Sequence, residues 1–207
     1  MIAIIDYGLG NLESVKYALD RLERASELTS DPERILSADG VILPGVGAFG
    51  RAMEMFGRRN LLEAAREAAG SGRPFMGICL GQQLLLTVSA EHGTHEGLDI
   101  IPGKVVRFGE DLTVPHMGWN QVRQDGPCPL LEGIADESFF YFAHSYYVVP
   151  GERAAAVGTT EYGRRFASVI QSGMVFGTQF HPEKSGPVGL RMLSNFCGLC
   201  DRSECTG

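Results

Sequence analysis

Residues 74–86, PFMGICLGQQLLL, carry the strongest structural signal in the chain. They start as a short apolar run, of the kind that forms a strand buried on both faces, and continue with leucines at helical spacing. We predict a strand over 74–78 and a helix from Cys79 to about Ser89. Between them, GICLG (77–81) has the form G-x-nucleophile-x-G, in which a reactive side chain lies on a sharp strand-to-helix turn. Glycine at both flanking positions removes the side chains that would collide in so tight a turn.

Cys79 occupies the nucleophile position of this turn. At the first turn of a helix, free backbone N–H groups and the helix dipole favour an anion, and the thiolate is the reactive form of cysteine. The N–H of Leu80 would then face an oxyanion formed by attack of Cys79 on a carbonyl. On this motif alone, a buried cysteine that packs as a small hydrophobe stays an open alternative.

His181 is the predicted base for this nucleophile. It ends an apolar strand expected over 174–180, and catalytic groups gather at strand ends in open α/β sheets. Glu183, two residues later, would accept a hydrogen bond from the second imidazole nitrogen and so set its tautomer. A single histidine is more often structural, but the context QFHPE (179–183) favours the catalytic interpretation. His92 and His95, in EHGTH (91–95), are expected in an exposed loop rather than at a metal site.

The N-terminal half alternates strands and helices. This βαβαβα order predicts a parallel sheet covered by helices. The segment GLG (8–10) lacks the third glycine of a dinucleotide loop, so we interpret it as a tight turn. The expected elements are a strand over 2–5, a helix from an N-cap at Asn11 to about Arg24, a strand over 41–43, a glycine-rich loop over 44–47, and a helical region over 50–69 in which a break near Gly57 is left open.

The C-terminal half changes character, because strand signals follow one another with short turns between them. Such a run predicts an antiparallel or mixed extension of the sheet. A hairpin is expected at 171–173, and Pro187 is expected to open a last helix. The predicted strands are 100–108, 139–149, 154–160, 166–171 and 174–180.

Composition fits a globular protein of ordinary type. The 207 residues are 44% hydrophobic and 21% charged, with a formal net charge of −7. We predict one domain over 1–200 and a short tail over 201–207, although two small domains are not excluded. The acidic balance disfavours nucleic acid, no apolar run reaches the roughly 20 residues of a membrane span, and the first residues do not resemble a signal peptide. A cytoplasmic protein with reduced thiols is expected.

Three further cysteines lie near the C-terminus. Cys197 and Cys200 have CxxC spacing, and Cys205 follows them. A metal site or a redox pair is the functional alternative, but no second ligand pair of suitable spacing follows. We therefore favour incidental thiols and expect no metal.

GICLGQQL (77–84) with the distant HPE (181–183) resembles the class I (triad) glutamine amidotransferases. The resemblance extends over nearly the whole chain. It implies a flavodoxin-like α/β fold with a mixed, mostly parallel central sheet flanked by helices. It also implies hydrolysis of glutamine to glutamate and ammonia through a cysteinyl thioester, without a cofactor. Cys79, His181 and Glu183 match the nucleophile, base and orienting residue of the family.

Four other segments are similar to one branch of that family: IIDYGLGNL (4–12), LPGVGAF (43–49), PHMGWN (115–120) and YFAHSYY (141–147). Members of this branch are glutaminase subunits of histidine biosynthesis. The similarity implies a heterodimer in which ammonia passes to a (β/α)8-barrel cyclase subunit. It implies no nucleic-acid or membrane partner.

The resemblance also implies the remaining site residues. Gly45, Val46 and Gly47 match the strand beside the thioester, where a peptide must turn an N–H inward, so Leu80, Val46 and Gly47 are assigned to the oxyanion hole. The residues assigned to glutamine binding are Gly45, Gln83, Glu91, Ser145 and Tyr146. Gln83 and Glu91 hold the α-amino and α-carboxylate ends, and Ser145 stands where relatives often carry threonine.

Trp119, Asn120 and Tyr141 are assigned to the partner interface by the same resemblance. Core packing is the simpler role for large aromatic side chains. We favour the interface, because PHMGWN is too polar and glycine-containing for a core strand.

Other functions stay open. A glutaminase of another pathway, such as pyridoxal phosphate synthesis, would share the elbow and the HPE triplet, and complementation of a histidine auxotroph would separate the two. A catalytically inactive interaction module on the same fold is the alternative from a different class. Labelling of the thiol by a diazo-ketone glutamine analogue would distinguish it. A hydrolase of other amides is a third alternative.

Overall fold

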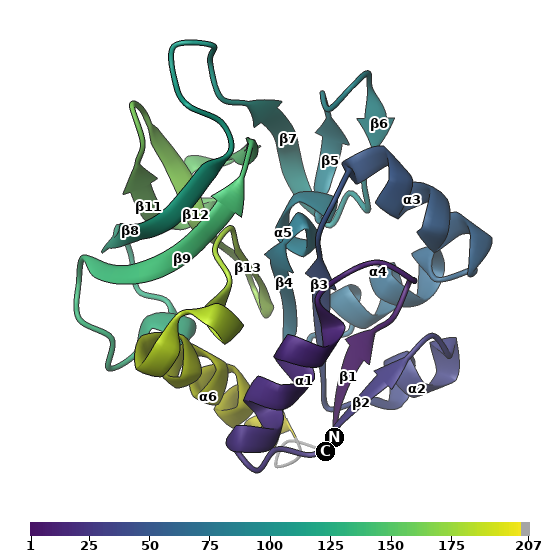
Figure 1. Cartoon of the computed structure of the whole chain (residues 1–207). Coiled ribbons are helices and arrows are strands. Elements are labelled where there is room, and N and C mark those ends of the chain that lie inside the picture. Colours follow the sequence, from purple (N-terminus) through teal and green to yellow (C-terminus); the bar gives the residue numbers. More distant parts are fainter. Residues whose placement is uncertain (204–207) are drawn as a thin grey trace.

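A computed structural model describes residues 1–203 of the chain (Figure 1). Its centre is a parallel sheet in which β4 lies between β3 and β13. Register pairs Gly45 with Cys79 and Thr178 with Ile78, so three strand ends meet at one edge. The parallel strands, in spatial order, are β2 (Ser26–Thr29), β1 (Ile2–Ile5), β3 (Gly40–Gly45), β4 (Phe75–Cys79) and β13 (Val175–Thr178).

Helices cover both faces of this sheet (Figure 1). Alternate residues of each strand enter different clusters: Ile4 packs with Val15 and Leu193, whereas Ile5 packs with Phe56 and Ala65. Burial on both faces explains why these strands are continuously apolar in sequence. One face carries α1 (Leu12–Arg21) and α6 (Gly186–Ser203), and the other carries α2 (Pro32–Ser37), α3 (Phe49–Arg58), α4 (Leu62–Gly70) and the short α5 (Leu80–Leu84).

The second half extends the sheet beyond β13, as predicted. The hairpin at 171–173 is confirmed, with Ser172 paired to Val175 across β12 and β13. Beyond it lie β12 (Arg165–Ser172), β10 (Tyr146–Pro150), β7 (Ile101–Arg107), β5 (Leu86–Ser89) and β6 (His95–Glu96). A two-stranded ribbon of β8 (His116–Gln124) and β9 (Ser138–His144) is attached through β11 (Ala156–Glu161), and short 3-10 turns occupy Pro129–Leu131, Arg153–Ala155 and Pro182–Lys184.

The predicted helix from Cys79 to Ser89 is wrong in its second half. Helix α5 ends at Leu84, and Leu86–Ser89 form β5, which pairs with β7 in parallel. The carbonyl of Leu85 accepts hydrogen bonds from the N–H groups of Ile100 and Ile101, at 2.9 and 3.0 Å. Pairing with a distant segment therefore overrides the helical spacing of the leucines.

Other boundaries also differ from the predictions. The helical region over 50–69 breaks at Arg59–Leu61, where Asn60 has a φ of 55°, and Gly57 lies inside α3. The predicted strand over 139–149 is interrupted at Ser145. The side chain of Asn11 does not cap α1, because its Oδ1 accepts from the Ser14 hydroxyl instead, at 2.8 Å. The sequence pattern did not indicate β2, α2, β6 or β8.

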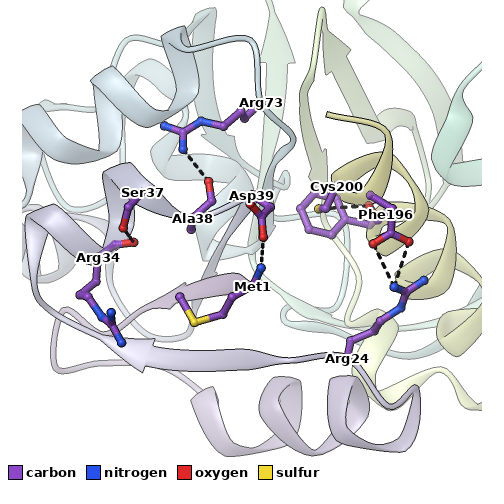
Figure 2. Close-up of polar contacts among 10 residues, drawn as sticks. Met1, Arg24, Arg34, Ser37, Ala38, Asp39, Arg73, Phe196 and Cys200 are labelled. Atoms are coloured by element: carbon purple, nitrogen blue, oxygen red, sulfur yellow. Dashed lines mark hydrogen bonds and ion pairs between the residues drawn. The ribbon is translucent and has the colours of Figure 1, made fainter. Parts of the chain in front are cut away.

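The two ends of the described chain meet below the sheet (Figures 1 and 2). The amino group of Met1 contacts the carboxylate of Asp39, and Arg24 forms an ion pair with Asp201 at 2.9 Å. Cys200, buried on α6, donates its thiol to the carbonyl of Phe196 at 3.4 Å. The predicted domain boundary at residue 200 falls within α6 and stays a prediction, and Cys205 lies outside the described residues.

Over the described residues, none of the helices combines the length and the apolar character required to cross a bilayer.

Candidate active site

Cys79 lies at the sharp turn between β4 and α5. Its φ of 55° is unusual for a residue with a side chain, and it is buried. A Cβ at Gly77 would lie 2.7 Å from the carbonyl of Gly81, and one at Gly81 would overlap the carbonyl oxygen of Leu43. Both glycines are therefore required by close backbone approach, and the turn presents Cys79 at the strand edge.

His181 lies beside Cys79 at the end of the neighbouring strand β13. Its Nδ1 is 2.8 Å from Glu183 Oε1, and its ring also forms a hydrogen bond with Cys79. Burial alone would lower the pKa of His181. Hydrogen bonds and negative charge from Cys79 and Glu183 outweigh burial and raise this pKa to about 10. The arrangement therefore favours an imidazolium held between the Cys79 sulfur and the Glu183 carboxylate.

Backbone contacts hold His181 in place. Its N–H donates to the carbonyl of Tyr141 on β9 at 2.9 Å, and its carbonyl accepts from the Ser185 hydroxyl at 2.6 Å. The same hydroxyl accepts from the N–H of Tyr141 at 3.0 Å. The backbone of His181 is thus bonded, directly and through Ser185, to the ribbon that carries Trp119.

Gln179 is a site residue that the sequence-based prediction missed. Its Nε2 lies 3.8 Å from Cys79 Sγ, and its Oε1 accepts from Gln83 Nε2 at 3.2 Å. Because side chains two residues apart along a strand share a face, the position of Gln179 relative to His181 was an available signal. The amide places a donor against the sulfur.

A cavity of about 730 Å³ opens in front of Cys79. It brings together most residues that the resemblance assigned to the site, whereas Gly45 lies beside it, in register with Cys79, and Glu183 lies behind His181. His92, Arg107, His144 and Lys184 also line it, without having been predicted. The assigned residues on its wall are Val46, Gly47, Cys79, Leu80, Gln83, Glu91, Ser145, Tyr146 and His181.

Gln83 and Glu91 are held by bonds of their own. Gln83 Nε2 donates to the carbonyl of Tyr146 at 3.0 Å. Glu91 Oε2 accepts from the N–H of Phe49, the first residue of α3, at 2.7 Å. Glu91 therefore anchors the helix that follows the glycine-rich loop, and the same residue lines the cavity.

The two segments assigned to the oxyanion hole flank Cys79. Leu80 is the first residue of α5 and is buried. Val46 follows β3 directly and is 38% exposed, and Gly47 has a φ of 96°. A positive φ at Gly47 is the conformation that glycine adopts without strain, so this loop can turn sharply next to the sulfur.

The residues assigned to the partner interface lie outside the cavity. Trp119 pairs with Tyr141 across β8 and β9, their ring centroids are 6.1 Å apart, and Trp119 is 56% exposed. Asn120 instead directs its side chain inward, where Nδ2 lies 3.2 Å from His116 Nε2 and donates to the carbonyl of Glu161. Of the histidines in 91–95, His92 is exposed on the cavity wall and His95 is part of β6.

Comparisons with known proteins identify the family of this chain. The family model "Glutamine amidotransferase class-I" matches residues 3–199. Imidazole glycerol phosphate synthase subunit HisH of Moorella thermoacetica is 56% identical over 94% of this chain and 93% of its own length. HisH of Desulfitobacterium hafniense (strain DSM 10664 / DCB-2) is 49% identical over 95% of this chain and 93% of its own length.

Solved structures share the fold at low sequence identity. A structure described as a glutamine amidotransferase aligns with a TM-score of 0.75 and 16% identity, over 97% of this chain and 100% of the other. A chain of PurLQS from Thermotoga maritima aligns with a TM-score of 0.72 and 18% identity, over 95% of this chain and 97% of the other. The chain belongs to the glutamine amidotransferase class-I family, in the group of imidazole glycerol phosphate synthase HisH proteins.

Proposed function

We propose that this chain is the glutaminase subunit of imidazole glycerol phosphate synthase. It hydrolyses L-glutamine to glutamate and ammonia, and passes the ammonia to a (β/α)8-barrel cyclase subunit that makes imidazole glycerol phosphate and an aminoimidazole carboxamide ribotide (AICAR). The observation that carries the proposal is the Cys79–His181–Glu183 array at the mouth of a cavity lined by Gln83 and Glu91. Membership in the HisH group supports the choice of pathway.

The first half of the reaction forms a thioester. Cys79 Sγ attacks the side-chain amide carbon of glutamine, and the carbonyl oxygen becomes an oxyanion. The N–H groups of Leu80 and Val46 stabilise this charge. As the C–N bond breaks, His181 gives its proton to the departing nitrogen, which leaves as ammonia. The raised pKa of His181 supports this role, because the proton is in place before the attack.

The second half hydrolyses the thioester. His181, now neutral, takes a proton from water while the water oxygen attacks the thioester carbon. The second tetrahedral intermediate collapses to glutamate, and Cys79 leaves as a thiolate beside the reprotonated imidazole. Glu183 keeps the proton on Nδ1, so that the other ring nitrogen faces the sulfur throughout.

The outer face of the β8–β9 ribbon is the proposed docking surface for the cyclase. Met117, Trp119 and Phe139 are 63%, 56% and 53% exposed on it, and large exposed apolar side chains that lie together mark interaction sites. Tyr141, which pairs with Trp119 there, accepts the hydrogen bond from the backbone of His181. The side chain of Asn120 points inward, so we propose that Asn120 contacts the cyclase through its backbone alone.

Control by the partner is part of the proposal. The isolated subunit is nearly inactive, because the N–H of Val46 is turned away from the oxyanion until the cyclase and its nucleotide bind. Gly47, next to Val46, supports this view, because glycine permits a change of peptide orientation at low cost. The complex is placed in the cytoplasm, where its thiols stay reduced: Cys79, Cys128, Cys197 and Cys200 are all free.

Glutaminase turnover in the reconstituted complex tests the proposal. The chain is co-purified with a cyclase subunit, and glutamate formation is measured with and without the cyclase ligand. We expect the cyclase ligand to stimulate glutamate formation strongly. In Cys79→Ala, glutamate formation should be lost completely. Cys128→Ala, a matched removal of another buried thiol outside the cavity, should keep activity.

Three results would contradict the proposal. Activity retained in Cys79→Ala would show that Cys79 is not the nucleophile. Full activity of the purified chain alone would show that the partner does not control the glutaminase. Failure to restore growth of a histidine auxotroph lacking its own glutaminase subunit redirects the chain to another pathway.

A further inference from the structure

Two buried histidines lie side by side at the cavity, with His144 on its wall and His116 behind His144. His116 on β8 pairs in register with His144 at the end of β9, and Nδ1 of His116 is 2.9 Å from Nε2 of His144. Neither histidine has a role in the proposed mechanism. Aromatic rings enclose the pair: Phe142 and Tyr162 stack on His116, and Phe108 and Phe166 contact both imidazoles.

Hydrogen-bond partners at both ends determine where each proton lies. His144 Nδ1 is 2.8 Å from the carbonyl of Tyr146, which only accepts, so His144 carries its proton on Nδ1 and accepts on Nε2. His116 must then donate from Nδ1 and accept on Nε2. Asn120 Nδ2, identified as the donor by its bond to the carbonyl of Glu161, supplies that hydrogen at 3.2 Å. In all three bonds the donor therefore lies on the Asn120 side and the acceptor on the Tyr146 side.

The chain of bonds continues to the nucleophile through the Tyr146 carbonyl. This oxygen accepts a second hydrogen bond, from Gln83 Nε2 at 3.0 Å. Gln83 also donates to Gln179, whose amide contacts Cys79. A continuous series of contacts thus joins β8 of the ribbon to a residue assigned to glutamine binding and to the sulfur.

We propose that His144 is a positioning residue for the glutamine substrate, and that His116 and Asn120 hold it in the tautomer that fixes the Tyr146 carbonyl and Gln83. The inference rests on the proposed glutaminase function and adds a structural connection between β8 and the glutamine-binding residue Gln83. We call the series of bonds from Asn120 through His116, His144 and the Tyr146 carbonyl to Gln83 the relay. A shift of β8 on docking of the cyclase would be transmitted to the substrate through this relay.

Charge at the site is consistent with neutral rings. Burial lowers the pKa of His116 to about 4 and that of His144 to about 3, and the positive charge of His181 opposes a second charge on His144. Aromatic rings and the amide of Asn120 also face the pair, and the cavity wall that His144 lines carries Arg107 and Lys184. Neither ring competes for the proton on His181, and the direction of the relay persists at neutral pH.

Nitrogen-15 NMR of the labelled chain tests the relay directly. Both His116 and His144 should be neutral at pH 7 and protonated on Nδ1, which is the less common tautomer of free histidine. A ring protonated on Nε2, or a charged ring, overturns the assignment. This measurement needs no activity, so its outcome is separate from that of the proposed function.

Kinetics of two substitutions at His144 test the positioning role in the reconstituted complex. His144→Phe keeps the ring but removes the donor to Tyr146, and should raise the KM for glutamine about tenfold with a smaller change in kcat, the equivalent of one lost hydrogen bond. In His144→Asn the amide nitrogen takes the place of Nδ1 and should restore most of the affinity. Equal KM values for His144→Phe and the unmodified enzyme, or equal damage in both variants, overturn the proposal.

A control variant separates positioning from general instability. Asn195 donates to the carbonyls of Leu130 and Glu132 away from the cavity, at 2.9 and 2.8 Å. Asn195→Asp should therefore lower the melting temperature without changing the KM. If the unmodified complex shows no glutaminase activity, the proposed function fails, whereas the NMR result on the relay still stands.

Discussion

His181 Nδ1 lies 2.8 Å from Glu183 Oε1, and the two side chains are only 3% and 1% exposed. A buried imidazolium is costly unless it is paired, and here Cys79 and Glu183 contact the ring from two sides. The pKa of His181, about 10, therefore depends on its neighbours and not on the ring alone.

Cys79→Ala should lower the pKa of His181 substantially. The substitution removes the hydrogen bond and the negative charge of the thiolate, while burial, which lowers the pKa, remains. NMR titration of the His181 ring in both proteins measures the change. An unchanged pKa would mean that the thiol and the imidazole are not paired.

The same raised pKa predicts a pH dependence of stability. Because the folded-state pKa of His181 lies above its ordinary value of 6.5, the stabilisation is fully present below pH 6.5 and is lost as the pH rises through about 10. Urea unfolding at several pH values measures the free energy of unfolding of the unmodified chain and of Cys79→Ala. The difference between these two free energies should decrease as the pH rises from 6.5 through about 10.

Gln179→Leu should slow reactions of Cys79. The amide of Gln179 is a donor 3.8 Å from the sulfur, and leucine has similar size without a donor. We expect about a tenfold decrease in kcat/KM for glutamine and slower alkylation of Cys79, as for loss of one hydrogen bond to a charged group. Gln171→Leu, which changes a glutamine that donates to the hairpin carbonyl of Gly173, is the control and should react at the normal rate.

Gly81→Ala should destabilise the fold by about 3 kcal/mol, because the added methyl group overlaps the carbonyl of Leu43 and the backbone at the turn must move. Gly57→Ala is the matched control. It lies in α3 with no atom within 4 Å of the added Cβ, so it should be stabilised by about 1 kcal/mol through helix propensity. Free energies of unfolding in urea check both values, and equal stability of the two variants would contradict the tight-turn explanation.

Arg107→Gln should weaken glutamine binding. Arg107 pairs with Tyr146 between β7 and β10, and both Arg107 and Glu91 line the cavity, so the wall presents opposite charges to the zwitterionic end of the substrate. We expect a KM about tenfold higher at unchanged kcat, since the lost contact is made equally in ground and transition states. Lys104→Gln, on the same strand but outside the cavity, should leave the KM unchanged; a change in kcat alone for Arg107→Gln would argue against substrate binding.

The elbow and the α/β architecture were predictable because their causes are local. Gly77 and Gly81 flank Cys79 at positions where no Cβ fits, and the buried strands read as unbroken apolar runs. The same local logic failed after Leu84, because the leucines of 84–86 suit a helix and a buried strand equally well. Only pairing of β5 with β7 selects between them.

Amino-acid order alone indicated the candidate nucleophile and base, since the GICLG motif around Cys79 and the His181–Glu183 pair are both visible in the sequence. It could not show that Gln179 reaches the sulfur, that Arg107 lines the cavity, or that His144 and His116 form a relay. Those relationships join segments that are up to 100 residues apart. They arise because parallel strand ends converge at one edge and the β8–β9 ribbon folds back beside it, and such convergence is a property of packing rather than of any one segment.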